Sequence, residues 1–243
     1  MKQVRAMPAL AMVLLAAACG GDGPTDVDTA ASVRFFNATT DMAGSGAFTT
    51  NGQFASGSAL AFGQSTQACS TVEAGATSFG FGAANAAGTG LGGDALATLS
   101  DQSITEAGNF TVAATGSAAS PAVFVLSNDF SASTLASSQA AVRFVNLAPG
   151  TGENPNIFNV LTGDIGSGPT AVFATQLAAG APSAFRAVAS GSSAYSILLG
   201  HSVAVTGSAA TLDLQAGTVN TIAIVPDPAS GSFQLINIPR CPA

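Results

Sequence analysis

The chain contains few of the side chains that bind nucleic acids or perform acid–base chemistry. Its 243 residues include no tryptophan, one tyrosine, one histidine and six basic residues against 13 acidic ones, so the formal net charge is −7. Proteins bind phosphate backbones through clusters of lysine and arginine, and this sequence has no such cluster. The composition therefore argues against a nucleic-acid partner and against attachment to anionic lipid by charge alone.

With a single histidine, His201 would have to serve any Ser-His-Asp triad or zinc site in the chain. It lies at a predicted hairpin, and no serine sits in a Gly-x-Ser-x-Gly elbow. Gly88-x-Gly90-x-x-Gly93 matches the dinucleotide-binding pattern, but no amphipathic helix follows it. We interpret His201 as a turn residue and the glycines as a loop, and predict no catalytic residue, metal or cofactor.

Long apolar runs are missing beyond the N-terminal segment, although 47% of the residues are hydrophobic. A membrane-spanning helix needs about 20 consecutive apolar residues, so none is expected there. Residues 1–18 combine Lys2 and Arg5, a short apolar core and three alanines, which is typical of a secretory signal peptide. The stretch Leu15-Ala16-Ala17-Ala18-Cys19-Gly20 resembles the lipobox of bacterial lipoproteins.

The lipobox resemblance implies that the signal peptide is cut before Cys19, whose thiol and new amine are then acylated. Acyl chains anchor a protein with roughly 0.8 kcal/mol per buried methylene, so we expect the membrane to be a partner through Cys19. The resemblance to Gram-negative lipoproteins further implies that Gly20, in place of aspartate, favours the outer membrane, and it leaves open which side the protein faces. Residues 19–30 then form the acylated cysteine and a flexible acidic tether. The alternative is an ordinary signal peptide followed by an incidental cysteine.

A short signature occurs twice in the chain. Its residues are Val33, Arg34, Phe35 and Asn37 in one copy, and Val142, Arg143, Phe144 and Asn146 in the other. The offset is 109 residues (142 − 33), and residues 124–128 match 233–237 at the same offset. Two matches at one offset indicate a tandem duplication of whole domains. The predicted units are residues 31–130, a serine-rich linker at 131–139, and residues 140–243 with a C-terminal tail.

Both copies consist of short apolar stretches rich in β-branched residues, with turn signals such as Asn51-Gly52 every 8–12 residues or so. No long segment has a convincing period of about 3.6 residues. The pattern predicts two tandem antiparallel β-sandwich domains. In the signature strand, Val33, Phe35 and Asn37 share one face, and Arg34 and Phe36 the other.

Three stretches carry a resemblance to a known family. The signature, Leu60-Ala61-Phe62-Gly63 and Val72-Glu73-Ala74-Gly75 resemble the bacterial family called domain of unknown function 4397, whose members are secreted or lipid-anchored and often tandem. The resemblance implies an immunoglobulin-like or transthyretin-like sandwich and provides no catalytic residues. The second copy lacks the Leu-Ala-Phe-Gly stretch.

Arginines and cysteines are the remaining candidates for special roles. Arg34 and Arg143 occupy equivalent positions, so we expect a structural role, such as pairing with an acidic neighbour on the outer sheet face, with ligand binding as the alternative. With Cys19 acylated, Cys69 and Cys241 remain in an oxidising compartment. We predict that they form a disulfide that ties the tail to the first domain, so that the domains lie side by side. Free thiols or an intermolecular bridge are the alternatives.

These observations favour a non-catalytic, lipid-anchored protein of the cell envelope that serves structure, adhesion or protein interaction, with an unknown protein or glycan partner. The alternative is a binder of small ligands or glycans, with a site between the domains. A cleft lined by Tyr195 and Arg186 would favour this alternative. A third hypothesis is a hydrolase, which a buried serine or aspartate close to His201 would favour.

Overall fold

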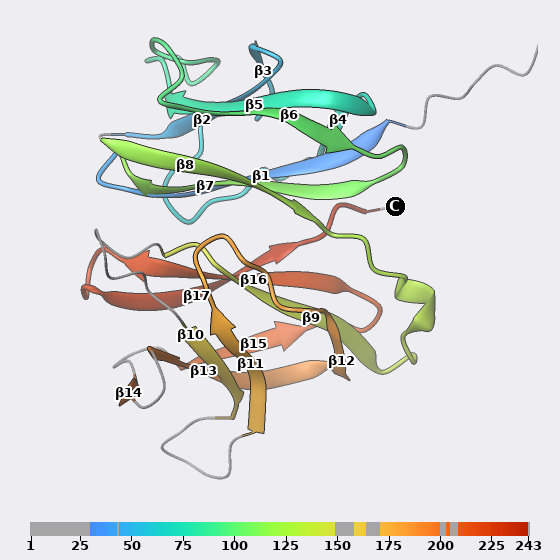
Figure 1. Cartoon of the computed structure of the whole chain (residues 1–243). Helices are drawn as coiled ribbons and strands as arrows, with labels where there is room; N and C mark the ends of the chain where they lie inside the picture. The colour runs from blue at the N-terminus through green and yellow to red at the C-terminus, as the bar shows by residue number, and fades with distance from the viewer. Residues whose placement is uncertain are drawn as a thin grey trace, which may run out of the picture.

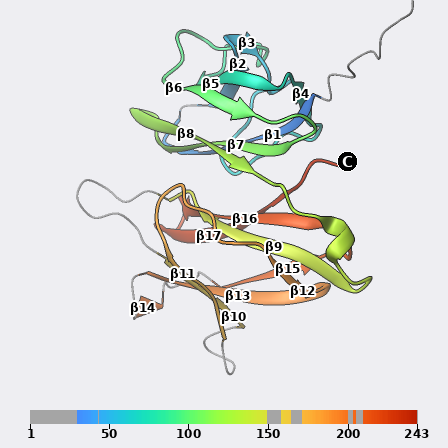
Figure 2. The same ribbon diagram turned by 45° about the vertical axis from the view of Figure 1, so that its right-hand side comes forward.

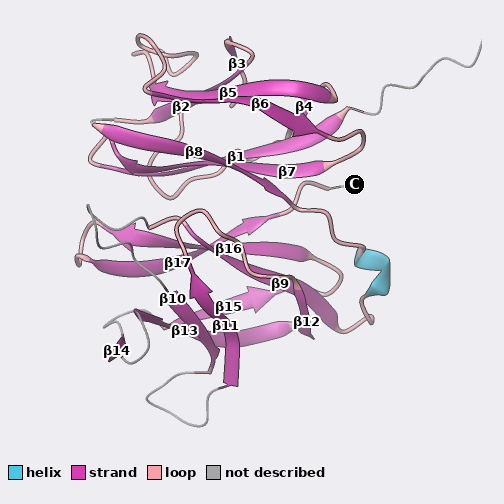
Figure 3. Ribbon diagram, viewed as in Figure 1, coloured by secondary structure: helices cyan, strands magenta, loops and turns pink. Residues whose placement is uncertain are grey.

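The computed structural model describes residues 30–42, 44–148, 158–163, 171–199, 203–204 and 209–242. Within these ranges the regular structure is β-strand, apart from one 3₁₀ turn at Ala132–Thr134 in the linker (Figure 3). The predicted all-β fold with two sandwich-like domains is confirmed. The signal peptide, Cys19, most of the tether and His201 lie outside the described residues.

The first domain consists of two four-stranded sheets, with strand orders β4-β1-β7-β8 and β3-β2-β5-β6. Its strands are β1 (Ala31–Thr40), β2 (Gly46–Thr50), β3 (Gln53–Phe54), β4 (Ser70–Val72), β5 (Gly75–Ala83), β6 (Ala97–Ile104), β7 (Asn109–Ser117) and β8 (Ser120–Ser127).

The second domain repeats this arrangement with the sheets β12-β9-β16-β17 and β11-β10-β13-β14, and β15 also pairs with β13. Its strands are β9 (Gln139–Asn146), β10 (Phe158–Thr162), β11 (Ala171–Leu177), β12 (Arg186–Ala189), β13 (Gly191–Leu199), β14 (Val203–Ala204), β15 (Ala210–Leu214), β16 (Val219–Asp227) and β17 (Ser232–Pro239).

One strand pair in each domain departs from the expected antiparallel pairing. β1 pairs with β7 in parallel, and β9 pairs with β16 in parallel, whereas the other strand pairs are antiparallel. Parallel neighbours need a long crossover connection. Here the chain supplies it by building the other sheet of the sandwich, for example β2, β3, β5 and β6 between β1 and β7.

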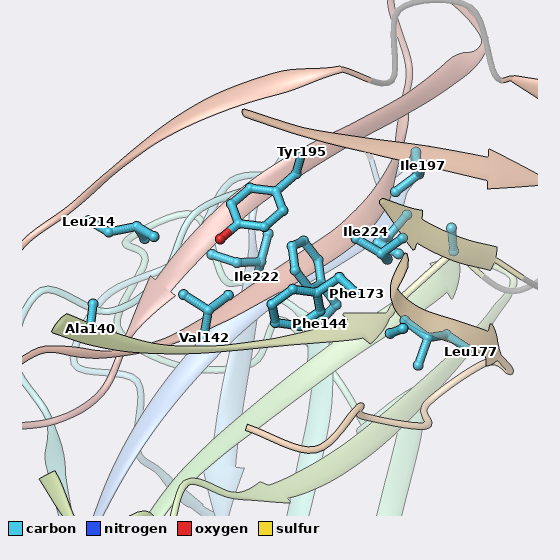
Figure 4. Packing of buried hydrophobic residues seen from close by; sticks show 13 residues of the cluster. Ala140, Val142, Phe144, Phe173, Leu177, Tyr195, Ile197, Leu214, Ile222 and Ile224 are labelled. Carbon is cyan, nitrogen blue, oxygen red and sulfur yellow. The ribbon is translucent and has the colours of Figure 1, made fainter. Parts of the chain in front are cut away.

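Each sandwich has its own aromatic core. In the first, the Phe35 and Phe48 ring centroids lie 5.0 Å apart, and Phe48 and Phe81 lie 4.8 Å apart. In the second, Phe144 lies 5.0 Å from Phe173 and 5.1 Å from Tyr195, and the three rings meet among aliphatic side chains (Figure 4). The signature residues Val33, Phe35, Val142 and Phe144 are fully buried in these cores, as their positions in alternating strands require.

A third apolar cluster joins the two domains. It contains Phe36, Ala38, Ala113 and Leu126 from the first domain, and Val145, Leu147, Ala223, Val225 and Ile238 from the second. These residues lie on the opposite faces of the strands that build the cores, so the β1 and β9 sheets face each other. The result is a stack of four sheets (Figures 1 and 2).

The strand register corrects one of the two sequence matches. Arg34 pairs with Thr111 and Arg143 with Thr221, so β1 and β9 are equivalent at the offset of 109. Phe124, however, pairs with Ala113, and Ile236 pairs with Ala223. Phe124 therefore corresponds to Ile236, 112 residues later (236 − 124), and not to Phe233. The β16–β17 hairpin has four loop residues where the β7–β8 hairpin has two, and one further residue is inserted before β16.

Candidate functional site

The asparagine of the signature holds a loop in each domain. Asn37 Nδ2 donates to Leu60 O at 2.8 Å, and Asn146 Nδ2 donates to Leu177 O at 3.0 Å. Each Oδ1 accepts the backbone N–H two residues on, at 2.9 Å. Both asparagines are buried. Each asparagine therefore uses its own amide groups inside the protein and ties its strand to the loop, in addition to the backbone bond that Leu60 O accepts from Gly46 N.

These bonds reveal a stretch that the sequence comparison missed. Gly63 N donates to Asn37 O, and Gly180 N donates to Asn146 O, so Leu177-Ala178-Ala179-Gly180 is the counterpart of Leu60-Ala61-Phe62-Gly63. The second copy does lack the phenylalanine of the stretch, but it keeps the loop with Ala179 in that place. The offset has grown to 117 (177 − 60) because the chain between β9 and this loop is longer, and a comparison without gaps passes over it.

The two signature arginines face the other domain and not solvent. Arg34 is 6% exposed and donates from Nη1 to the carbonyls of Thr66 and Gln67. Burial lowers its pKa from the usual value. The expected outer sheet face is thus the interface between the domains, and Arg34 holds the loop that leads to Cys69.

Arg143 is 5% exposed and bonds to neutral oxygens. Its Nη2 donates to Asn128 Oδ1 at 2.6 Å, its Nε donates to Thr221 Oγ1 at 3.0 Å, and its guanidinium lies 4.5 Å from the Phe185 ring centroid. Burial lowers the pKa of Arg143 to about 10, against the opposing charge of Asp129. Arg143 therefore remains charged at neutral pH, and an acidic residue acts on it by charge, not as a hydrogen-bond partner.

Asn128 is the centre of a polar seam formed by Asn109, Thr111, Asn128, Arg143 and Thr221, all buried. Its Nδ2 donates to Thr111 Oγ1 at 2.9 Å and to Asn109 Oδ1 at 3.3 Å. Asn109 Nδ2 in turn donates to Cys241 O at 3.0 Å. The seam thus links both domains and the C-terminal tail in one hydrogen-bonded network.

The contacts between the domains are reciprocal. The segment after β8 reaches the second domain, where Phe130 lies 5.3 Å from Phe185 between ring centroids. The segment after β17 reaches the first domain, where Cys241 forms a disulfide with Cys69, with the Cα atoms 6.0 Å apart. Cys69 and Phe185 precede the equivalent edge strands β4 and β12. Reciprocity of this kind is the mark of an isologous interface.

The same reciprocity appears at two glycines. Phe124 packs against Gly180, where an added Cβ would lie 2.6 Å from Phe124 Cδ1. Its counterpart Ile236 packs against Gly63, where an added Cβ would lie 3.1 Å from Ile236 Cδ1. Both glycines have positive φ, +73° and +75°, which favours glycine on conformational grounds as well.

Two clefts lie among the described residues of the second domain. The larger, of about 460 Å³, lies where the linker turn, the start of β16 and the C-terminal tail meet, and it is lined in part by Asp213, Gln215, Asn237 and Arg240. The smaller, of about 290 Å³, is lined by Arg186, Phe173 and neighbours. Tyr195 is 1% exposed in the core, so the cleft expected from Tyr195 and Arg186 together does not form.

Across the described ranges, no three His, Cys, Asp or Glu side chains gather as metal ligands would. Nor does any helix in the part of the chain that the structure describes reach the length and apolarity needed to cross a membrane.

Comparison with known proteins identifies one family. The model of "Domain of unknown function (DUF4397)" matches residues 31–153, which span the first domain, the linker and β9. No curated protein matches the chain.

Proposed function

The chain belongs to the DUF4397 family, and we propose that it is a non-catalytic, lipid-anchored protein of the bacterial cell envelope that serves structure, adhesion or protein interaction. In this proposal the second β region is a second copy of the same domain. The repeated asparagine bonds and the repeated Leu-Ala-x-Gly loop support this duplication.

The single observation that carries the proposal is the fusion of the two sandwiches into one body. An apolar cluster, a polar seam and a disulfide join them. Arg34, Arg143 and Arg240 each donate hydrogen bonds that hold loops or the linker in place. Surface loops and sheet edges are then the regions available to a partner, as is common for rigid scaffolds.

The direction of the strands supports an outward presentation. β1, β7, β9 and β16 all run away from the end that holds Ala31, the linker turn and the C-terminal tail (Figure 1). A tether before Ala31 attaches at this end. The β7–β8 and β16–β17 hairpins lie at the opposite end, so an anchored chain would hold them away from the membrane.

The anchor is tested by metabolic labelling with an alkyne analogue of palmitate, followed by membrane fractionation. Wild type should incorporate the label and sediment with the outer membrane. The Cys19→Ala variant should lose the label and become soluble or stay unprocessed. Cys69→Ala is the matched control and should retain the label. Processing and sedimentation of the Cys19→Ala variant like wild type would contradict the anchor.

The contact role is tested in the native envelope with a photo-crosslinking amino acid placed at single exposed alanines. Ala119 and Ala229 lie in the two hairpins, and Ala136 lies in the linker at the anchor end. Defined protein adducts should form from the hairpin positions and not from Ala136. Adducts from Ala136 alone, or from none of the three positions, would contradict outward contact through the hairpins.

A further inference from the structure

The larger cleft has the size and position of a ligand site. Its volume of about 460 Å³ falls within the roughly 300–1,000 Å³ of small-molecule pockets. Three segments distant in sequence form it: the linker turn at Ala132, the turn into β16, and the tail from Pro239 to Pro242. The cleft lies at the end of the molecule that holds the linker turn and the tail, away from the hairpins, and binding of a ligand there goes beyond the proposed envelope role.

Two buried polar atoms on the cleft wall have no hydrogen-bond partner, Asn237 Oδ1 and Arg240 Nε. Buried polar groups of this kind are normally paired, so each unpaired atom requires an explanation. One is an acceptor and the other a donor. A hydroxylated, acidic ligand offers both complementary groups. Arg240 Nη1 donates to Phe130 O at 2.8 Å, which leaves the other terminal guanidinium nitrogen, Nη2, for a ligand in the cleft that Arg240 lines.

The remaining lining narrows the ligand class. Arg240 is the cation of the cleft, and guanidinium groups bind carboxylates through two parallel hydrogen bonds. Asp213, Gln215 and Thr218 offer oxygen and amide groups that suit hydroxyls. The lining residues include no aromatic ring, so the cleft would recognise a ligand through hydrogen bonds and not by stacking.

We propose that this cleft binds a small polyhydroxylated acid, of the size of a hexuronate, with its carboxylate on Arg240. The tail that carries Arg240 is held from both sides. Arg240 N donates to Val219 O at 3.1 Å, Asn109 Nδ2 donates to Cys241 O, and Cys241 is bonded to Cys69. The disulfide therefore preorganises the wall, and its reduction weakens ligand binding.

The test is calorimetric titration of the mature chain from residue 20, which contains every described residue, with galacturonate and with its neutral match, galactose. Galacturonate should bind, and galactose should bind at least about tenfold more weakly, because hydrogen bonds to charged groups are the stronger ones. Arg240→Gln should weaken galacturonate binding by at least about tenfold, while Arg186→Gln, at the smaller cleft, should leave it unchanged.

Two further measurements keep the proposal open to refutation if Arg240→Gln misfolds. Gln215→Ala, at an exposed lining residue outside the tail, should weaken galacturonate binding without changing circular dichroism. Reduction of wild type should weaken it as well. Absence of galacturonate binding to folded wild type, equal binding of galactose, or full binding by folded Arg240→Gln would each overturn the ligand assignment. Unchanged affinity after reduction would overturn the role of the disulfide.

Discussion

Gly180 provides a direct measure of how strongly the two domains depend on each other. It lies in the second domain, and its Cα hydrogen points at Phe124 of the first, so that an added Cβ would lie 2.6 Å from Phe124 Cδ1. Carbon atoms in contact are normally about 3.5–4.0 Å apart. The substitution Gly180→Ala therefore forces either the Phe124 ring or the interface to move.

The cost has two separable parts. An alanine at φ +73° adopts the left-handed conformation, at about 1–2 kcal/mol. Overpacking against the partly buried Phe124 ring adds about 1–3 kcal/mol. Gly217 isolates the first part, because its φ is +75° and an added Cβ there meets nothing within 4 Å. We therefore expect Gly180→Ala to lower the free energy of unfolding by about 1–3 kcal/mol more than Gly217→Ala does.

Urea denaturation of the mature chain, monitored by circular dichroism, measures the free energy of unfolding of both variants. The same measurement in a Phe124→Ala background tests whether the extra cost of Gly180→Ala comes from the Phe124 ring. In a Phe124→Ala chain the ring is gone, so Gly180→Ala should cost only as much as Gly217→Ala. Equal costs of the two glycine substitutions in the wild-type background would refute the packing of Phe124 on Gly180. So would an unchanged excess cost in the Phe124→Ala background.

Three other predictions follow from the same contacts and from the anchor. Serine at Cys69 or Cys241 should lower the free energy of unfolding by up to about 5 kcal/mol, from a loop of 172 residues in the chain-entropy model; two thiols alkylated in unreduced wild type would contradict this. Asn146→Ala removes the hydrogen bond from Asn146 Nδ2 to Leu177 O and should cost about 0.5–1.5 kcal/mol, seen as faster hydrogen exchange in that loop. Gly20→Asp should shift the protein from the outer to the inner membrane on a density gradient, and unchanged sedimentation would refute the sorting signal.

The face-to-face packing of the two domains explains why strand β1 has apolar residues on both of its faces. Nearly all of Ala31–Thr40 is buried, with Val33 and Phe35 in the domain core and Phe36 and Ala38 in the interface. A strand with one face in solvent alternates apolar and polar residues. Apolar residues on both faces of β1 and of its counterpart β9 were therefore a signal that both sheets are covered. The alternation of side chains predicts the two faces of β1 correctly, but the face expected to be outer lies in the interface between the domains.

The arginines were misread for the same reason. A repeated arginine on an exposed face would pair with an acidic neighbour, but Arg143 is buried against Asn128, Thr221 and the Phe185 ring. Asn128 comes from the first domain, and the sequence contains no local signal that brings it to Arg143. The sequence does not predict the cleft beside the tail either, because its walls come from the linker, β16 and the residues after β17.

The sequence by itself determined the strands, the two sandwiches and the repeated signature, because strand periodicity and turn residues act over a few neighbouring positions. Only the tertiary structure decided which sheet faces meet, which residues of the two copies are equivalent after insertions, and where the polar seam and the cleft form. These depend on contacts between residues far apart in the chain, such as Asn128 with Arg143 and Phe124 with Gly180. Such contacts form where apolar faces and unpaired polar groups of two finished domains fit each other, and neither copy encodes that fit in its own local pattern.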